Sequence, residues 1–550
     1  MPKHVVGFNS GRGLRDGEAA AKALQAETGG NNMEISAEQN RKVRKMATGW
    51  RAQRRLFTRQ IVAAAVTLLV LTFAGCSYFQ EQPEIQPDRF APAAPDRSWT
   101  EARSLREEYA VPPAPQSHGA RVTVIPSPAN PPMPSGKRQS LATLIDISLT
   151  NNPETRRSWE NARAAAAAYG ASRAPYYPLV NSSGDAGYQR ILFQSPRTIV
   201  IQQWQIDPMI NLTYTLADFG RRSSEAEIAR QQLAASNFTF NRVMQNVVFG
   251  VQQSFYALAA AKAAVQAAQQ NVELARTDLE AVQQRLDLGL ATQPALLLAR
   301  ERKAQSEFEL ENAKTLVNDA RAALAVAIGV PANQPLDVEP LRNQAVPKSL
   351  GQEVDELIAT GVRDRPDLSA EVARLRQREA EQARARADWF PVLGVSANYT
   401  QANWWYNFQA APVTFSSQPQ YAALLGIRWD IFTGFRRLND DRGTEADRAA
   451  QRESVRSLEL QTIAEVWRSY YDFQTAVKRY EFAQALLAAA QEAYDDNIET
   501  YRQGLSTIVE LLTADRDLAN ARFTMIQSTA NVLTSSAAVA NAVGATTPGR

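Results

Sequence analysis

Two stretches of the chain share one short phrase: RLDLGLATQPALLLAR at Arg285–Arg300 and YRQGLSTIVELLTADR at Tyr501–Arg516. Each places Gly-Leu-x-Thr in the middle of a long helical pattern, 215 residues from the other. Glycine inside a helix is about 1 kcal/mol less favourable than alanine. The matched glycines therefore indicate that two helices are interrupted at equivalent places. The residues of the two phrases are Gly289, Leu290, Thr292, Gly504, Leu505 and Thr507.

The segments before the two phrases carry the spacing of coiled-coil helices. Residues 219–288 contain no proline and hardly a glycine, and at 1.5 Å per residue they would form a helix about 105 Å long. Apolar residues recur every seven positions, which is the period of a coiled coil, and Pro294 suits the first turn of the next helix. Each phrase is therefore predicted to be a tight turn between antiparallel helices. The recurring residues are Val265, Val272, Leu279 and Leu286, and in the second stretch Tyr480, Leu487, Tyr494 and Tyr501.

The chain is predicted to be a tandem repeat. The Asn-Pro pair at 152–153 corresponds to the Arg-Pro pair at 365–366, and Gly329 corresponds to Gly544. Each unit is expected to run helix, two strands, very long helix, helix. The predicted parts are a first helix at Leu141–Ser172, units at 140–334 and 353–546, and a connection at 335–352.

The strand pattern is clearest in the second strand of each unit. Apolar residues alternate with polar ones in Ile210–Leu216, and in Leu425–Ile431 the polar face includes Arg428 and Asp430. Period two with one polar face indicates a strand, and this composition suits a transmembrane barrel with a wet interior. A half-buried strand of a soluble sheet is the alternative. The segments between the paired strands are predicted to be exposed loops, at 189–205 and 400–420.

The predicted fold is mainly α with transmembrane β. Four strands cannot close a barrel, and an open edge in lipid leaves backbone groups unpaired. Bacterial outer-membrane barrels begin at about 8 strands. Three chains would give a shared 12-stranded barrel and a long antiparallel coiled-coil α-barrel, although two or four copies would also close.

The N-terminus is predicted to be a lipoprotein signal. Basic residues precede the apolar run Ile61–Ala74, which is short for a bilayer span, and small residues precede Cys76, the one cysteine of the chain. Cleavage before Cys76 and acylation of this cysteine would anchor the chain in lipid. Palmitate is the label by which the acylation can be detected. A signal-anchor helix is the alternative. The predicted segments are a non-native or disordered extension at 1–45, a signal peptide at 46–75, and an acylated, proline-rich linker or docking segment at 76–139.

Composition argues against several other classes of protein. From Cys76 onward 48 basic residues face 52 acidic ones, so there is no nucleic-acid footprint. His4 and His118 lie in segments predicted to lack structure, which leaves no Cys/His metal cluster and no catalytic triad on a plausible scaffold. No enzyme activity, cofactor or metal is expected.

Residues 140–545 resemble the TolC-like family of outer-membrane efflux proteins, in particular its lipoprotein branch. The resemblance rests on the paired units, the arginine pairs at 221–222 and 436–437, and the Gly-Leu-x-Thr turns. It implies a homotrimeric conduit in the outer membrane of a Gram-negative bacterium, extending into the periplasm. Small molecules such as drugs would reach it from an inner-membrane transporter through a periplasmic adaptor protein.

The resemblance also assigns roles to residues. The two Gly-Leu-x-Thr turns would contact the adaptor, although the glycines and threonines also suit turn and cap positions. Tyr501, Glu510 and, as a lesser candidate, Asp515 would line or hold the periplasmic aperture, or Glu510 would be a solvated helix charge. Ala295 stands where the family has an acidic partner for the tyrosine, so the closed state must be held differently. The main alternative function is the channel of a type I protein secretion system, and a periplasmic coiled-coil adaptor is a further one.

Overall fold

A computed structural model describes residues 94, 96–99, 138–194, 198–408 and 412–545. All of them belong to one compact unit, Ile85–Arg550, which is described here by itself. The predicted extension at 1–45, the signal peptide at 46–75 and the lipid-anchor residue Cys76 lie outside the described residues.

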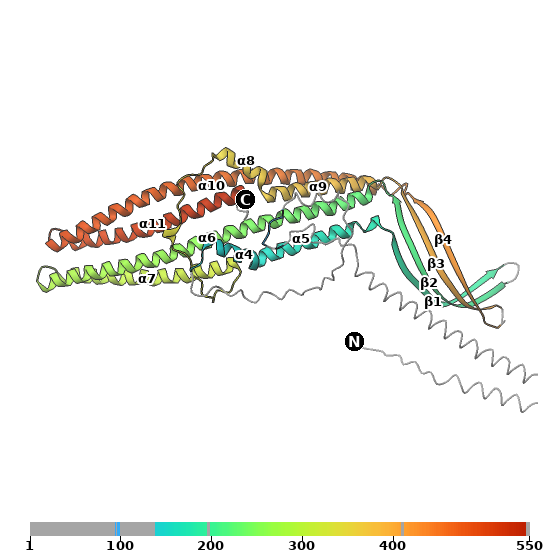
Figure 1. The fold of residues 1–550 in the computed structure, drawn as a ribbon, viewed down its shortest axis with the longest axis horizontal. Helices are drawn as coiled ribbons and strands as arrows, with labels where there is room; N and C mark the ends of the chain where they lie inside the picture. The colour runs from blue at the N-terminus through green and yellow to red at the C-terminus, as the bar shows by residue number, and fades with distance from the viewer. Residues whose placement is uncertain (1–93, 95, 100–137, 195–197, 409–411, 546–550) are drawn as a thin grey trace, which may run out of the picture. The chain divides into compact units, whose positions relative to one another are not determined.

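The two halves of the unit have the same order of elements (Figure 1). The first half consists of α4 (Leu141–Asn151), α5 (Pro153–Ser172), the 3-10 turn η2 (Ala174–Tyr176), β1 (Leu179–Gln194), β2 (Thr198–Ala217), α6 (Arg221–Asp287) and α7 (Gln293–Ile328). The second half begins after the 3-10 turn η3 (Leu341–Asn343). It consists of α8 (Val354–Asp364), α9 (Pro366–Ala387), β3 (Val392–Phe408), β4 (Thr414–Arg428), α10 (Arg436–Gln503) and α11 (Ile508–Val543). No helix in the described ranges combines the length and the apolar character needed to cross a membrane.

Three sequence predictions about element boundaries are wrong. The expected strand Leu425–Ile431 ends at Arg428, so Asp430 lies beyond the strand and not on its polar face. The expected single helix Leu141–Ser172 is two helices, because Asn152 leaves the helical conformation and caps α5 by accepting a hydrogen bond from the Glu154 amide at 2.8 Å. The predicted loops at 189–205 and 400–420 are largely strand. Gln189 pairs with Gln203 and Gln401 pairs with Pro419, so the polar and aromatic residues there extend the ladders. Their composition reflects the two faces of a sheet rather than a loop.

The four strands form one antiparallel sheet in the order β1-β2-β3-β4. The pairing of β2 with β3 joins the two halves of the chain. Ile210, Tyr399 and Tyr421 are partners across three strands and therefore lie on the same face, where each is exposed. The opposite face carries polar residues such as Asn211 and Asn398, which are also partners. The outer edges of β1 and β4 pair with no other strand of the described chain.

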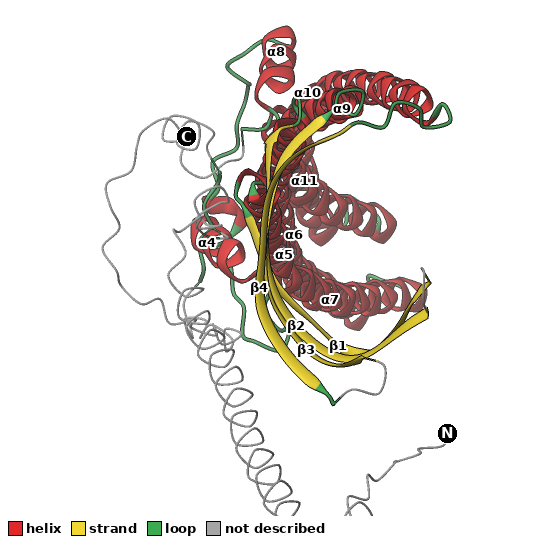
Figure 2. Ribbon diagram, turned by 90° about the vertical axis from the view of Figure 1, so that its right-hand side faces the viewer, coloured by secondary structure: helices red, strands yellow, loops and turns green. Residues whose placement is uncertain are grey.

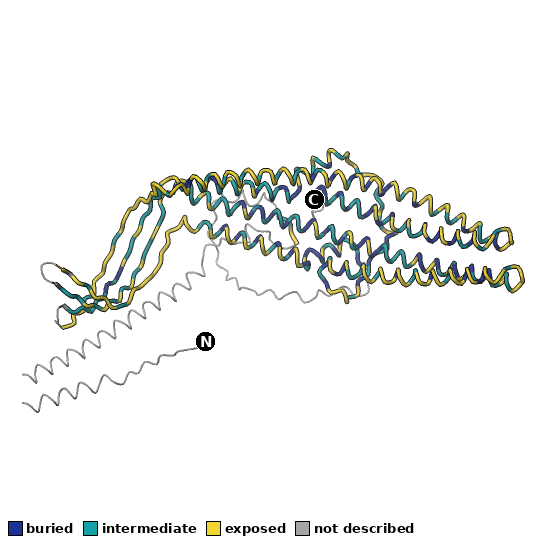
Figure 3. Tube along the Cα trace, turned by 180° about the vertical axis from the view of Figure 1, so that it is seen from behind, coloured by how far each residue is buried: buried dark blue, intermediate teal, exposed yellow. Residues whose placement is uncertain are grey.

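The core lies between the helices, and the strands are mostly exposed or half-buried (Figure 3). Alanine, leucine and valine fill the seams between the long helices, for example at Ala268, Ala275 and Val282 of α6. Small residues at these positions allow close approach of the helices. The end view shows α4 and α8 on the same side of the long helices (Figure 2). The turn between α6 and α7 and the turn between α10 and α11 lie at the end of the helices away from the sheet (Figure 1).

The linker touches the helices at one described point. The Trp99 amide donates to the Asn241 side chain at 2.8 Å, and the Asn241 amide group donates back to the Trp99 carbonyl at 2.9 Å. The Trp99 ring also meets Phe238 edge to face, with centroids 5.1 Å apart. This part of the proline-rich segment therefore docks on α6.

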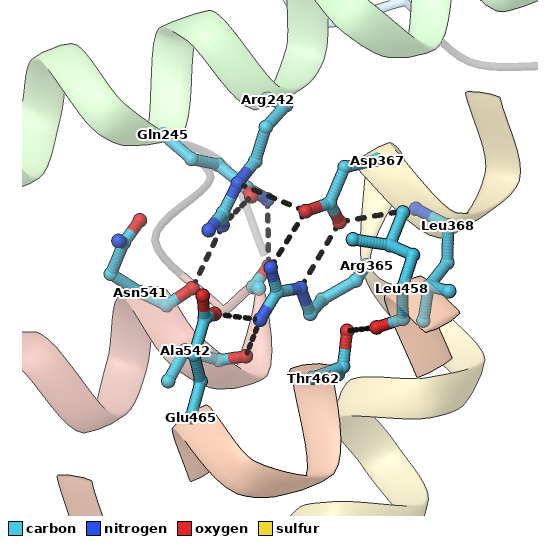
Figure 4. Close-up of polar contacts among 11 residues, drawn as sticks. Arg242, Gln245, Arg365, Asp367, Leu368, Leu458, Thr462, Glu465, Asn541 and Ala542 are labelled. Carbon is cyan, nitrogen blue, oxygen red and sulfur yellow. Dashed lines mark hydrogen bonds and ion pairs between the residues drawn. The ribbon is translucent and has the colours of Figure 1, made fainter. Parts of the chain in front are cut away.

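In each half, the C-terminal end of the last helix packs against the junction of the first two helices of that half. Asn152 donates to the Ala327 carbonyl of α7 at 2.8 Å. At the equivalent place Arg365 donates to the Ala542 carbonyl of α11 at 3.2 Å and also pairs with Glu465 and Asp367, while Arg242 of α6 donates to the Asn541 carbonyl (Figure 4). The two arginines satisfy carbonyls at the negative end of the α11 dipole.

Gly329, which ends α7 with φ +75°, has no room for a side chain. A Cβ there would lie 2.8 Å from the Asn151 carbonyl oxygen, whereas Gly289, with φ +73°, has no atom within 4 Å of that position. Gly329→Ala should therefore lower the free energy of unfolding by about 1–3 kcal/mol more than Gly289→Ala, because both incur left-handed strain and only the first adds a clash. Melting temperatures of the two purified variants test this, and equal shifts would contradict it.

Candidate functional site

The first turn is built by Gly289. Its positive φ lets the chain leave α6, and the Leu290 amide donates to the Arg285 carbonyl at 2.7 Å. Thr292 caps α7 by accepting from the Ala295 amide at 3.4 Å, and Pro294 occupies the first turn as predicted. Glycine and threonine therefore have turn-building roles at this position, and Leu290 projects with 64% of its surface exposed.

The second turn has the same form with a stronger cap. Gly504 has φ +80°, and the Leu505 amide donates to the Thr500 carbonyl at 2.9 Å. Thr507 and Glu510 form a capping box, in which the Thr507 amide donates to the Glu510 carboxylate at 2.7 Å. That hydrogen bond lowers the pKa of Glu510. Glu510 is exposed, and Leu505 is 75% exposed at the tip.

Arg285 connects the two tips. Its guanidinium donates to the Tyr501 carbonyl and lies over the Tyr501 ring, 4.8 Å from the centroid. The Tyr501 side chain is buried in an apolar cluster with Ala295, Leu296 and Leu511. Tyr501 therefore contacts an arginine of the other hairpin. Position 295, where the family resemblance implies an acidic partner for this tyrosine, is alanine in this chain.

A buried polar layer joins the two hairpins farther from the tips. Three pairs cross between them: Tyr494 of α10 donates to Asp278 of α6 at 3.0 Å, Arg302 of α7 donates to Asp515 of α11 at 2.6 Å, and Arg522 of α11 donates to Asn271 of α6 at 2.8 Å. Asp278 and Asp515 are fully buried. The structure thus places Asp515 within the helix packing, facing Arg302, rather than at an exposed surface.

This layer is incompletely paired among the described residues. One side-chain atom each of Asn271, Asp278, Arg302 and Asp515 has no hydrogen-bond partner there. Such groups cost free energy inside a core. The polar pairs at this level therefore contribute less to stability than fully satisfied ones would.

Burial, followed by the neighbouring Asp515 carboxylate, raises the pKa of Asp278 to about 7. Arg302, Arg502 and the Tyr494 hydroxyl face the same carboxyl group and oppose this shift. Burial also raises the pKa of Asp515, against the effect of Arg302. The layer therefore holds a carboxyl group that changes charge near neutral pH.

Sequence reasoning did not single out Asn271, Asp278 or Arg302. The signal was present, because Asn271 and Asp278 alternate with Ala268, Ala275 and Val282 at the inward positions of the α6 heptads. A polar residue at such a position needs a partner, and only the packing of the other hairpin identifies it.

The geometry described above can be compared with known proteins. The model of the outer membrane efflux protein family matches residues 144–330 and 361–545. The chain belongs to this family. Membership makes it an outer-membrane channel protein of an efflux system and places it in the outer membrane.

Relatives of this efflux protein cover most of its length. Protein CyaE of Bordetella pertussis is 27% identical over 454 residues, which are 80% of this chain and 90% of CyaE. Pyoverdine export outer membrane protein OpmQ of Pseudomonas putida is 24% identical over 418 residues, 74% of this chain and 85% of OpmQ. The solved structure of the outer-membrane channel OprN has the same fold, with a TM-score of 0.66, 20% identity and coverage of 79% of this chain and 99% of OprN.

The contact between the hairpins of this efflux protein should weaken as pH rises. The folded chain keeps a proton on Asp278 up to about pH 7, whereas an unfolded aspartate loses it near pH 3.8. The stabilisation is therefore complete below pH 3.8 and is lost as pH rises through 7. Asp278→Asn should flatten the pH dependence of the stability of this contact, which is on the order of 3 kcal/mol between pH 5 and pH 7.

Hydrogen exchange of α6 and α10 between pH 5 and 8, corrected for the intrinsic pH dependence of exchange, measures the effect. Asp287→Asn, on the exposed end of the same helix, is the matched control. An unchanged pH dependence in Asp278→Asn would contradict the assignment.

Proposed function

We propose that this chain forms a passive, homotrimeric conduit that exports small molecules from an inner-membrane transporter through a periplasmic adaptor. The carrying observation is the placement of two exposed leucine tips at the end of the helices away from the sheet (Figure 1). No catalytic step or cofactor is part of the proposal. The duplicated order of elements supports the interpretation of the chain as a tandem repeat.

The sheet supports the trimer. Its edges at β1 and β4 have unpaired backbone groups, and one face exposes Ile210, Tyr421 and other large apolar residues. Lipid would cover the apolar face, and pairing of β4 with β1 of the next chain would satisfy the edges. Three chains of four strands then make the 12-stranded barrel, with the polar face toward the channel.

The tips support contact with the adaptor. Leu290 and Leu505 are exposed next to backbone turns that rigid caps hold in place. Isolated apolar side chains on a firm turn suit insertion into a groove between helices of a partner. We infer that Gly289, Thr292, Gly504 and Thr507 build the two turns and that the leucines make the contact.

The second hairpin is the proposed moving part of the aperture. Exposed Glu510 would form a ring of negative charge in the trimer and favour cations. Arg285 against Tyr501, and Arg302 against Asp515, would hold the two hairpins together in the closed state. In this proposal Asp515 pairs with Arg302 to hold the hairpins together and does not itself line the aperture.

The cargo assignment rests on the relatives and on the predicted lipid anchor. OpmQ is named for export of pyoverdine, a small molecule. A deletion strain compared with the complemented strain, across antibiotics, dyes and solvents, tests the cargo. Loss of a secreted protein with unchanged susceptibility would favour protein secretion instead.

Charge at the tips should abolish export without changing assembly. Leu290→Glu with Leu505→Glu should reduce complementation of the deletion strain to that of the empty vector, because buried glutamates cannot dock in an apolar groove. Val326→Glu, exposed on the same hairpin far from the tip, is the matched control. Native mass in detergent should be three chains for all variants, and a stable monomer of the unmodified protein would refute the shared barrel.

The anchor prediction concerns Cys76. Cys76→Ala should abolish metabolic palmitate labelling, because the thiol is the predicted acylation site. Cys76→Ser keeps the size of the residue and should likewise take up no palmitate label. Label retained by both variants would contradict the lipoprotein assignment.

A further inference from the structure

A charged cavity lies where the sheet meets the helices in the second half of the chain. Its volume is about 340 Å³, and its lining comes from α6, α9, β3, β4 and α10. Five arginines and three aspartates line it. The arginines are Arg221, Arg384, Arg428, Arg436 and Arg437.

The positive charge of this cavity exceeds its negative charge. Asp388 is engaged by Arg221 at 3.4 Å, and Arg384 pairs with Glu225 at 2.7 Å. Arg428 and Arg436 form no ion pair or side-chain hydrogen bond with any described residue. Two guanidinium groups are therefore available to an incoming anion.

Arg437, which is buried, also lacks a close ion-pair partner in the described chain. Its side chain is 9% exposed, and its only ion-pair partner in the described chain is Asp430, 4.0 Å away and largely exposed. It donates no hydrogen bond to a described residue and lies over the Trp389 ring at 5.9 Å. A buried guanidinium normally has its N–H groups satisfied by acceptors.

The first half of the chain shows how such a junction is completed from within. Arg222, the counterpart of Arg437, donates to Asp218 at 2.8 Å and to the Thr215 carbonyl at 2.8 Å. Thr433 occupies the position of Asp218 in the second half. The carboxylate that satisfies the first arginine is therefore missing from the second junction.

We propose that this cavity binds an oxyanion, the phosphate or carboxylate group of a solute in the channel, on Arg428, Arg436 and Arg437. The guanidinium fork matches the oxygen atoms of either group in bidentate geometry. Arg428 is the register partner of Val392 at the helix end of the sheet, on the same face as Gly426 and Leu424 and opposite the face of Ile427 and Leu425. In the proposed barrel this face lines the channel.

The inference rests on the proposed conduit only for the origin of the ligand. It adds a positively charged binding site where the sheet meets the helices, at the opposite end of the helices from Glu510. Anionic solutes would be retained at this level, and three copies of the cavity would surround the path.

Inorganic phosphate is the probe, and phosphorus NMR line broadening on the purified full-length protein in detergent measures its binding. Arg428→Gln with Arg436→Gln should weaken phosphate binding at least about tenfold, since two charge-assisted contacts are lost. Arg452→Gln with Arg456→Gln removes the same charge from exposed positions of the same helix and should leave binding unchanged.

A second variant tests the comparison between the halves. Thr433→Asp restores the carboxylate of the first junction and should displace phosphate while keeping the melting temperature. Acetate should compete with phosphate in the unmodified protein if a carboxylate is also accepted, and failure to compete would restrict the ligand to phosphate and overturn the carboxylate part.

Phosphate binding that is absent from the unmodified protein, or equal in all variants, would overturn the site. The former result also follows if a carboxylate of a second chain fills the cavity in the trimer. Drug export by the same variants is measured separately, so loss of the anion site with normal export would leave the conduit proposal intact.

Discussion

The pairing of β2 with β3 is the constraint on which the rest of this structure depends. Residues 201–217 and 393–408 are far apart in the chain, and their antiparallel ladder places the two halves next to each other. A ladder satisfies backbone groups only in one register, so α6 and α10 leave the sheet in a fixed relation. The two hairpins then run side by side, and their tips lie next to each other at the end away from the sheet (Figure 1).

Apolar and polar contacts have different tasks along those hairpins. Alanine, leucine and valine seams hold each hairpin together and tolerate no large opening. The contacts between hairpins include an apolar cluster near the tips, with Leu296 of one hairpin against Leu511 of the other. They also include polar pairs: Arg285 with Tyr501, Tyr494 with Asp278, and Arg302 with Asp515. Buried polar pairs contribute less net stability than packed apolar seams and respond to charge. An efflux channel that opens by separating hairpins would therefore break the polar pairs together with the apolar cluster near the tips, while the seams within each hairpin stay intact.

The two halves share the order of their elements but differ in chemistry at several matched positions. Asn152 meets a helix end with an amide, whereas Arg365 meets the equivalent end with a charge and two carboxylate partners. Thr507 has a capping box and Thr292 does not. Arg222 is satisfied by Asp218, whereas Arg437 lacks the corresponding acid. The junction of sheet and helices in the second half is thus the one with an incompletely paired arginine.

The sequence by itself determined the elements whose signals are local. Heptad spacing, the glycine turns, Pro294 and the alternation of Leu425–Ile431, which is strand as far as Arg428, predicted hairpins and strands. These signals are local because backbone conformation and burial follow from neighbours within one or two turns. The sequence misjudged 189–205 and 400–420, where the two strands of each hairpin pair with each other, because the mixture of polar and aromatic residues there resembles a loop when each strand is considered alone. Only the tertiary structure decided that Asp278 meets Tyr494, that Asp515 is buried against Arg302, and that Arg437 lacks an acceptor. The first two facts depend on side chains 216 and 213 residues away, which no local pattern contains. The third depends on how Arg437 packs where the sheet meets the helices.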